Sequence, residues 1–337
     1  MQVEGNPIFN ILYSSRICYS LLFANEVGLF TSLSNHHIGQ TLENISADLG
    51  IHPRAMNALL KMCVNLNLLQ FHNGLYSITD ITKKYLLPDS PYYFGDMITP
   101  LSTFPSAYSY EAFCETIFAN QPIAVITGDS SLFKETEDNP ESARVLTKAM
   151  HSKSLEPSTF WPKIFPFENH ELMLDIGGGS GIHSINMALK WPNMQAIVYD
   201  RPLICNVADS YIKEYNLQTR VKTMNGNMWS AIFPDADVHF YSDIFHDWPI
   251  EKCQLLAQKS YDSLPQGGKI IVHEILFDNS ITGPYSAAVF NLMMLLLTHG
   301  EQLTQNQLHK MLSKVGFKNI ETIKTGLDDW SITTGVK

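Results

Sequence analysis

Hydrophobic and polar residues follow two different patterns along the chain, and the change lies near residue 171. From Ser14 to Phe71 apolar residues recur at intervals of three and four, which predicts several short helices. From Leu172 onward short apolar runs alternate with amphipathic segments, which predicts a mainly parallel sheet with helices on both faces. We therefore expect a helical N-terminal part and an α/β C-terminal part, since 337 residues are enough for two cores.

The N-terminal part contains a pattern typical of a winged helix. Residues 44–79 predict a helix, a turn, a second helix and two short strands, with Asn73-Gly74 at the hairpin tip. Winged helices often bind DNA, but the first 90 residues carry five Lys and Arg against six Asp and Glu. The whole chain has a formal net charge of -10 and no visible basic patch. Nucleic acid and anionic membranes are therefore not expected partners.

Boundaries are expected near residues 90 and 165. Residues 91–165 are rich in aromatic residues and mostly helical in pattern, and the prolines and asparagine of STFWPKIFPFENH mark a junction. We expect three segments: 1–90, 91–165 and 166–337. Seven strands are expected in segment 166–337. Five of them lie at 172–176, 196–200, 221–224, 238–242 and 269–275, and the other two lie in the tail 318–336, where the final strand is expected to be antiparallel.

Several classes of protein do not fit the composition. No apolar run approaches the roughly 18 residues of a membrane span, and the first residues lack a basic stretch followed by an apolar one. The five cysteines are scattered and form no C-x-x-C pair, which argues against a disulfide framework and a zinc site. We expect a soluble, cytoplasmic protein with reduced thiols.

The sequence DIGGGSG, Asp175 to Gly181, lies where a predicted strand ends and a helix begins. Glycines there let the backbone turn tightly and approach a ligand closely. The dinucleotide pattern G-x-G-x-x-G fails because Ile182 stands where glycine is needed, and no Gly-Lys-Ser/Thr of a Walker loop follows. Asp200 ends the next strand, 19 residues beyond Gly181, where a carboxylate can accept from both ribose hydroxyls. The combination predicts a nucleoside-containing cofactor.

Six motifs together resemble one family. They are DIGGGSG at 175–181, YDRP at 199–202, NGNMW at 225–229, FHDW at 245–248, LPQGGKIIVHE at 264–274 and HGEQLT at 299–304. With them the second domain resembles class I S-adenosylmethionine-dependent methyltransferases. The whole chain resembles the small-molecule O-methyltransferases of plants and bacteria that carry an N-terminal winged-helix dimerisation domain. The resemblance implies a homodimer formed by segment 1–90, with segment 91–165 contributing to the acceptor pocket and segment 166–337 binding the cofactor.

The resemblance also implies which residues bind S-adenosylmethionine. They are Asp175, Gly177, Gly179, Gly181, Asp200, Arg201, Asn227, Met228 and Ser242. The family usually has an acid where this chain has Asn227. An amide oxygen can still accept from the adenine amino group, so we expect cofactor binding to survive with a modest loss.

Transfer of a methyl group to a phenol, whose pKa is about 10, requires a base. His246 follows the fourth predicted strand by four residues and histidine titrates near neutral pH. The resemblance matches His246 to the family's catalytic histidine, and Glu274 and Glu301 to two flanking acids. A carboxylate that accepts from the imidazole fixes its tautomer and raises its basicity. Asp247 is interpreted as the start of the next helix, and no metal site is expected.

The acceptor pocket is expected to contain apolar side chains that suit a flat molecule. The candidates are Met150, Phe245, Trp248, Phe290, Asn291, Met293 and Met294, with Tyr110 and Phe113 as further possibilities. Apolar residues at helical spacing are more often core residues than ligand contacts, and the resemblance to the family is the reason to place these ones near the acceptor. The resulting hypothesis is O-methylation of a phenolic or enolic small molecule, with His246 as the general base that removes the proton of the hydroxyl. N-methylation, a non-methylating reaction on the same cofactor, and a winged-helix regulator that senses the cofactor are the alternatives.

Overall fold

The computed structural model describes residues 6–103, 108–126 and 136–337. Internal contacts divide it into two compact units, Met1–Phe104 and Pro105–Lys337. Each unit has its own buried apolar core, as the change in hydrophobic pattern predicts. The finer division into three segments at residues 90 and 165 stays a prediction.

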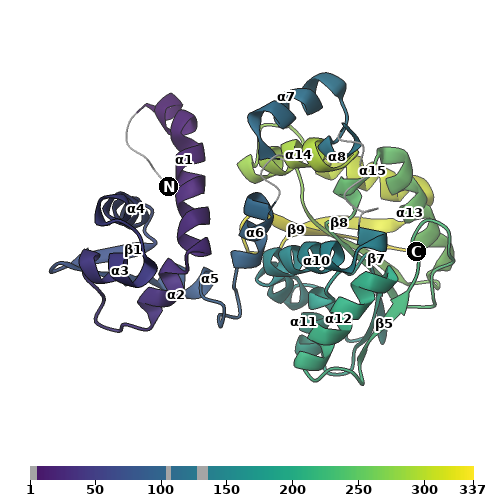
Figure 1. Cartoon of the computed structure of the whole chain (residues 1–337). Helices are drawn as coiled ribbons and strands as arrows, with labels where there is room; N and C mark the ends of the chain where they lie inside the picture. Colours follow the sequence, from purple (N-terminus) through teal and green to yellow (C-terminus); the bar gives the residue numbers. More distant parts are fainter. Residues whose placement is uncertain (1–5, 104–107, 127–135) are drawn as a thin grey trace. The chain divides into compact units, whose positions relative to one another are not determined.

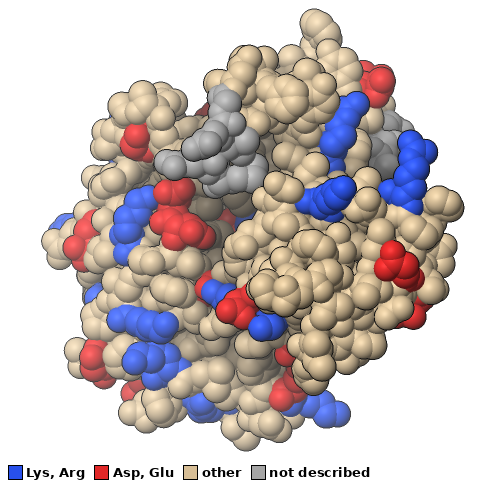
Figure 2. Space-filling model, turned by 90° about the vertical axis from the view of Figure 1, so that its left-hand side faces the viewer, with Lys and Arg blue, Asp and Glu red and all other residues tan. Residues whose placement is uncertain are grey.

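The first unit contains the predicted winged helix. Its elements are α1 (Pro7–Glu26), α2 (Leu29–Ser34), α3 (Leu42–Leu49), α4 (Pro53–Asn65), β1 (Leu69–His72), β2 (Leu75–Ile78), α5 (Asp80–Tyr85) and α6 (Gly95–Thr103) (Figure 1). Asn73 and Gly74 both have positive φ, 51° and 81°, which is the conformation of a type I′ hairpin turn. On the face that Figure 2 shows, basic and acidic side chains are interspersed. That nucleic acid is not a partner stays a prediction.

Helix α1 is longer than predicted and leaves large apolar side chains in contact with solvent. Ile8 is 66% exposed and Phe9 60% exposed, and Ile11, Leu12, Tyr13, Tyr19 and Phe23 are exposed as well. An apolar surface of this kind on one chain is typical of a surface that a protein partner covers. No helix among residues 6–103, 108–126 and 136–337 is long and apolar enough to cross a membrane.

The second unit is built around the expected seven-stranded sheet. Its strands are β3 (Leu172–Ile176), β4 (Gln195–Asp200), β5 (Val221–Asn225), β6 (Val238–Ser242), β7 (Lys269–Ile275), β8 (Lys318–Lys324) and β9 (Trp330–Val336). Their order is β5-β4-β3-β6-β7-β9-β8, and β9 runs antiparallel to both of its neighbours. The predicted α/β class, strand number and antiparallel final strand are confirmed.

Helices cover both faces of this sheet. In the described part of the unit the helices are α7 (Tyr110–Ala119), α8 (Ile123–Ile126), α10 (Pro140–Ser154), α11 (Ile182–Lys190), α12 (Pro202–Glu214), α13 (Ile250–Ser263), α14 (Tyr285–Leu297) and α15 (Gln305–Val315), with short 3₁₀ turns η2 (Pro157–Thr159), η3 (Trp161–Lys163) and η4 (Phe245–Asp247) (Figure 1). Of these, α11, α12 and α15 contact strands of the sheet, and α7 and α8 contact α14. Met173 and Phe240 belong to one buried cluster, and their neighbours Leu174 and Tyr241 to the other. The alternation follows from strand geometry, which sends successive side chains to opposite faces.

The topology determines where a ligand can bind. From β3 the chain builds β4 and β5 on one side and then returns to build β6 on the other. Doubly wound sheets bind ligands in the crevice at this switch point, at the carboxyl ends of the strands. The DIGGGSG segment follows β3, Asp200 ends β4, and His246 follows β6. All three therefore meet at this end of the sheet.

Candidate active site

The glycine loop after β3 adopts a conformation that requires glycine. Gly177, Gly179 and Gly181 have φ of 68°, 56° and 74°, a region that residues with a Cβ rarely adopt. A Cβ on Gly178 would lie 2.8 Å from Cγ of Asp175, whereas one on Gly179 would meet nothing within 4 Å. The loop is therefore packed tightly against the sheet at Gly178 and open at Gly179, where a ligand can approach the backbone.

Asp175 stabilises this loop from inside. Its carboxylate is buried and accepts from the Ser184 hydroxyl at 2.7 Å, which ties the end of β3 to the first turn of α11. Burial raises its pKa to about 7, and the nearby Asp200 charge acts in the same direction. The described hydrogen bond of the Asp175 side chain is made within the protein, and its predicted role in binding the cofactor stays a prediction.

Asp200 closes the other side of the loop. Its two carboxylate oxygens accept from the backbone N–H of Gly179 at 3.0 Å and of Arg201 at 2.7 Å. An ionised carboxylate has about four acceptor positions, so each oxygen can still accept from a ribose hydroxyl. The Arg201 guanidinium lies 4.0 Å from the same carboxylate and 3.5 Å from Glu137. The predicted pair of glycine loop and acid is thus brought together.

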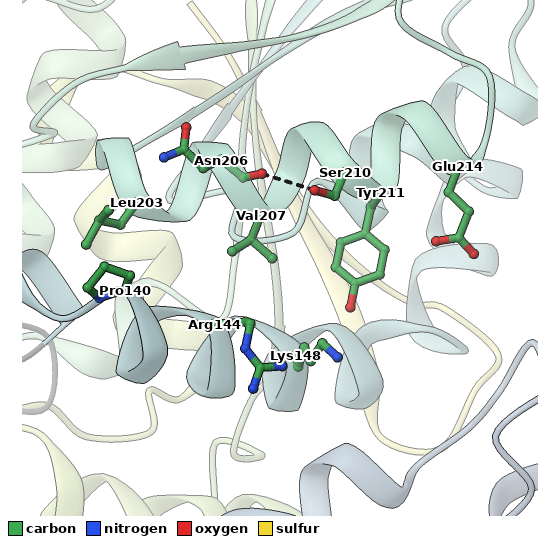
Figure 3. A pocket seen from close by; sticks show the side chains of 9 residues that line it. All are labelled: Pro140, Arg144, Lys148, Leu203, Asn206, Val207, Ser210, Tyr211 and Glu214. Carbon is green, nitrogen blue, oxygen red and sulfur yellow. Dashed lines mark hydrogen bonds between the residues drawn. The ribbon is translucent and has the colours of Figure 1, made fainter.

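Helix α10 supports the loop from the outside. Nδ1 of His151 lies 2.9 Å from the Ser180 hydroxyl, and its ring stacks on Tyr211 of α12 with 3.8 Å between centroids. Figure 3 shows Tyr211 in the groove of about 410 Å³ between α10 and α12. Pro140, Arg144, Lys148, Leu203, Asn206, Val207, Ser210, Tyr211 and Glu214 line this groove.

Three more residues predicted to bind the cofactor lie after β5 and at the end of β6. The side-chain oxygen of Asn227 accepts from the backbone N–H of Trp229 at 2.9 Å, so one acceptor position is used within its own turn. Met228 is half-buried and packs against an apolar cluster that includes Phe233. The Ser242 hydroxyl at the end of β6 lies 2.9 Å from Nδ1 of His273.

His246 lies in η4, directly after β6, and is only 2% exposed. Oε1 of Glu274, at the end of β7, accepts from the backbone N–H of Phe245 at 2.7 Å and of His246 at 3.2 Å. Glu274 is buried as well, and burial raises its pKa to about 8. This carboxyl group therefore fixes the backbone that carries the imidazole.

The hydrogen bonds of Gln302 determine the tautomer of His246. Nε2 of Gln302 donates to the backbone oxygen of Ile275, so its Oε1 faces Nδ1 of His246 at 3.1 Å as an acceptor. An acceptor at this position requires a proton on Nδ1, which leaves the lone pair on Nε2. Burial lowers the pKa of His246 to about 4, so the ring is neutral near pH 7. A neutral imidazole with a free Nε2 lone pair can accept a proton.

The predicted partners of the ring need correction. We expected Glu274 and Glu301 to accept from the imidazole, but Glu301 is exposed, Glu274 binds backbone, and the ring partner is Gln302. The pKa of His246 is nevertheless lowered to about 4, because burial outweighs the nearby negative charge of Asp243. Asp247, which we left out of the site, has Oδ1 3.7 Å from Nε2.

Two further residues near His246 escaped the sequence analysis. Oδ1 of Asp243 lies 3.8 Å from Nε2 of His246, and its Oδ2 forms an ion pair at 2.9 Å with Nζ of Lys153. Asp243 lies in the loop after β6, and its position just before the FHDW motif is the one sequence feature that could have pointed to it. For Lys153, on α10, no sequence signal existed.

The predicted acceptor residues divide into two groups. Phe290, Asn291, Met293 and Met294 lie on α14, which contacts η4, and Oδ1 of Asn291 accepts from the backbone N–H of Gln302 at 2.8 Å. Lys153 and Met150 share α10, and Nζ of Lys153 lies 4.3 Å from the ring centre of Phe290.

The second group lies in the core or at the surface. Phe245 is fully buried against Tyr241, and Trp248 packs on Trp229 with 4.7 Å between centroids, so core packing explains both. Tyr110 is 76% exposed on α7, the helix that also carries Phe113 and contacts α14. Within the described ranges, no group of three or more His, Cys, Asp or Glu is arranged to hold a metal ion.

Two family models match the chain. A model of the O-methyltransferase dimerisation domain matches residues 9–88, and a model of the O-methyltransferase domain matches residues 118–318. The chain belongs to the O-methyltransferase family. It is an S-adenosylmethionine-dependent methyltransferase of the small-molecule type. The match to the dimerisation domain, which covers the exposed apolar face of α1, supports a homodimer.

Relatives of this methyltransferase extend over nearly its full length. Acetylserotonin O-methyltransferase of Bos taurus is 28% identical and the match covers 96% of this chain and 95% of that one. The 3-hydroxy-5-methyl-1-naphthoate 3-O-methyltransferase of Streptomyces sahachiroi is 25% identical, covering 90% and 87%. The crystal structure of human N-acetylserotonin methyltransferase in complex with SAM has a TM-score of 0.89 at 22% identity, covering 100% and 99%, and shows the same fold.

The residues of the loop fit S-adenosylmethionine. The backbone is open at Gly179, and the carboxylate of Asp200 lies beside it with acceptor capacity left for two hydroxyls. A nucleoside at this position is in keeping with the switch point of the sheet. Asp200, Gly179 and Arg201 are therefore the residues that we expect to hold the ribose.

Replacing Asp200 by alanine is expected to weaken S-adenosylmethionine binding about 10-fold or more, because two charge-assisted hydrogen bonds are lost. Titration calorimetry on the folded variant measures this. Asp262→Ala, which removes an exposed carboxylate at the end of α13, is the matched control and should bind normally. Normal affinity in the Asp200 variant would show that the ribose binds elsewhere.

Proposed function

We propose that this methyltransferase methylates a hydroxyl group, phenolic or enolic, of an aromatic or polycyclic small molecule, with His246 as the general base. One observation carries the proposal: a buried, neutral imidazole whose Nδ1 proton is held by Gln302 and whose Nε2 lone pair is free. It lies at the same end of the sheet as the cofactor loop. The names of two relatives specify O-methylation, one of acetylserotonin and one of a hydroxynaphthoate.

The role of each residue follows from the chemistry of methyl transfer. S-adenosylmethionine, held by the glycine loop and Asp200, would supply a methyl group on a positively charged sulfur; the acceptor oxygen would bond to the methyl carbon as the carbon–sulfur bond breaks, and the electron pair of that bond would stay on sulfur. A phenol, with a pKa of about 10, is a poor nucleophile at neutral pH until it loses its proton. Nε2 of His246 takes that proton, while Gln302 and Glu274 hold the ring and its backbone. Phe290 and Met294 of α14 hold the flat acceptor.

The acceptor class can be tested with matched pairs of compounds. Hydroxylated naphthalenes and indoles are incubated with the protein and isotopically labelled S-adenosylmethionine, beside analogues in which an amine replaces the hydroxyl. We expect a mass gain of one labelled methyl group on hydroxyl compounds only, unaffected by a metal chelator. Transfer to the amines alone would establish N-methylation instead. Conversion of the acceptor without a labelled methyl group would establish a non-methylating reaction.

A further inference from the structure

Three titratable side chains, Lys153 of α10, Asp243 and His246, lie in a row. Nζ of Lys153 is 2.9 Å from Oδ2 of Asp243, and Oδ1 of the same carboxylate is 3.8 Å from Nε2 of His246. The side chains of Lys153 and Asp243 are only 9% and 13% exposed. The rings of Phe290 and Trp330 lie 4.3 Å and 5.6 Å from the Lys153 ammonium. The ion pair is thus enclosed, and solvent screens it little.

We propose that Asp243 is the charge partner of His246 during proton transfer and that Lys153 is the positioning residue that keeps Asp243 ionised and in place. The inference rests on the proposed function, since it assumes that His246 takes the proton. It assigns to this pair the role that the sequence suggested for Glu274 and Glu301.

The charge balance of the reaction explains why a partner is needed. A neutral acceptor gives its proton to Nε2, so a positively charged imidazolium forms in a buried position. Burial disfavours that cation, which is why the pKa of His246 is lowered to about 4 in the resting site. A carboxylate beside Nε2 stabilises the imidazolium and so makes the proton transfer easier. Asp243 already raises the pKa of His246, in opposition to burial.

Of the carboxyl groups near the ring, Asp243 is the one that meets these requirements. Burial alone would raise its pKa, but the charges of Lys153 and His246 outweigh burial and hold it below the usual value. Burial and the Asp243 charge raise the pKa of Asp247 well above its usual value, which favours its uncharged form. Glu274 already accepts from the backbone and has a pKa of about 8.

The local backbone favours the same assignment. Asp243 has a φ of 54°, in the left-handed region that aspartate and asparagine tolerate better than most residues. This turn directs the chain from β6 into η4. Asparagine can replace aspartate here with the same shape and the same backbone conformation, so the charge can be removed alone.

The test measures kcat/KM against pH for two single variants. Asp243→Asn removes a negative charge that raises the pKa of His246, so the acid limb should move down by about one pH unit and the rate at pH 7 should fall about 10-fold or more. Lys153→Met removes the charge that holds the pKa of Asp243 low, so Asp243 should take up a proton and the rate at pH 7 should fall as it does in Asp243→Asn. The groups that face the ring are otherwise unchanged: Asp247 from η4, Glu274 from β7 and the uncharged Gln302.

The decisive outcome is a lower rate in both variants together with an acid limb that moves down in Asp243→Asn, because a packing defect lowers the rate without moving the limb. The matched control is Lys148→Met, a lysine on the same helix that lines the groove towards α12 (Figure 3); its pH profile should equal the wild type. An acid limb that stays in place in Asp243→Asn, or a wild-type rate in Lys153→Met, would overturn the inference. So would a large loss of S-adenosylmethionine affinity in Asp243→Asn, which would assign Asp243 to the cofactor.

The failure of this inference is distinguishable from failure of the proposed function. If His246→Ala transfers methyl groups at the wild-type rate, then His246 is not the base and the proposed function itself is wrong. If His246→Ala is inactive and Asp243→Asn has the wild-type rate and profile, the base stands and only its charge partner has been misassigned.

Discussion

His246→Ala is expected to lose methyl transfer by about 10²-fold to 10⁴-fold, the usual contribution of a general base, while S-adenosylmethionine affinity stays unchanged. The substitution removes Nε2 and leaves the backbone of η4 held by Glu274. The glycine loop and Asp200 make none of their described hydrogen bonds to His246. Single-turnover rates and calorimetry on the same sample separate the two quantities. His72→Ala, which removes an exposed histidine of β1, is the control.

The deficit should depend on the acidity of the acceptor. A hydroxyl that is acidic enough to ionise without help needs no base, so His246→Ala should be nearly as active on it as the wild type. A packing defect would instead slow every acceptor by the same factor. A His246→Ala variant that methylates weakly acidic and strongly acidic phenols with an equal deficit would contradict the assignment of His246 as the base.

The fold could be predicted because apolar residues recur at the spacing of helices and strands, and glycine and proline mark the turns between them. Helix α11 begins at Ile182, directly after the glycine loop where the sequence predicts a helix to begin, and it ends at Lys190, before a tryptophan-proline pair. Helix α1 was predicted less well. Its apolar residues surround the whole helix, so no amphipathic period marked its beginning at Pro7.

The sequence could predict at which end of the sheet the site residues lie, but it could not predict which side chains contact one another there. Topology places Asp200 and His246 at the carboxyl ends of β4 and β6, the two parallel strands on either side of β3, and the alternation of strands and helices in the sequence predicts that they lie at the same end of the sheet. Which side chain faces the imidazole depends on the loop after α14, where no regular period fixes side-chain direction. A difference of one position separates the expected Glu301 from the observed Gln302. Lys153 lies on another helix far back in the sequence, so only the structure could bring it to Asp243.

The same loop contains a glycine that packs against η4, the turn that carries His246. A Cβ on Gly300 would overlap the backbone oxygen of His246 and backbone atoms of Asp247 and Trp248. Its φ is not in the left-handed region, so the constraint is one of space and not of backbone conformation. Backbone atoms cannot move aside as the end of a flexible side chain can. The glycine of HGEQLT is therefore required for the close approach of this loop to η4.

Gly300→Ala is accordingly expected to displace η4 and to reduce methyl transfer by about 10²-fold, since a shift of about 1 Å at a reacting group can cost that much. Insertion of a methyl group into a packed site should also destabilise the fold by about 1 to 3 kcal/mol, measured by denaturant unfolding. Cofactor affinity should persist, because the glycine loop lies on the other side of the switch point. The control is Gly283→Ala, where the nearest atom to an added Cβ is 3.7 Å away. Wild-type activity in Gly300→Ala would mean that the backbone contact between this loop and η4 does not position His246.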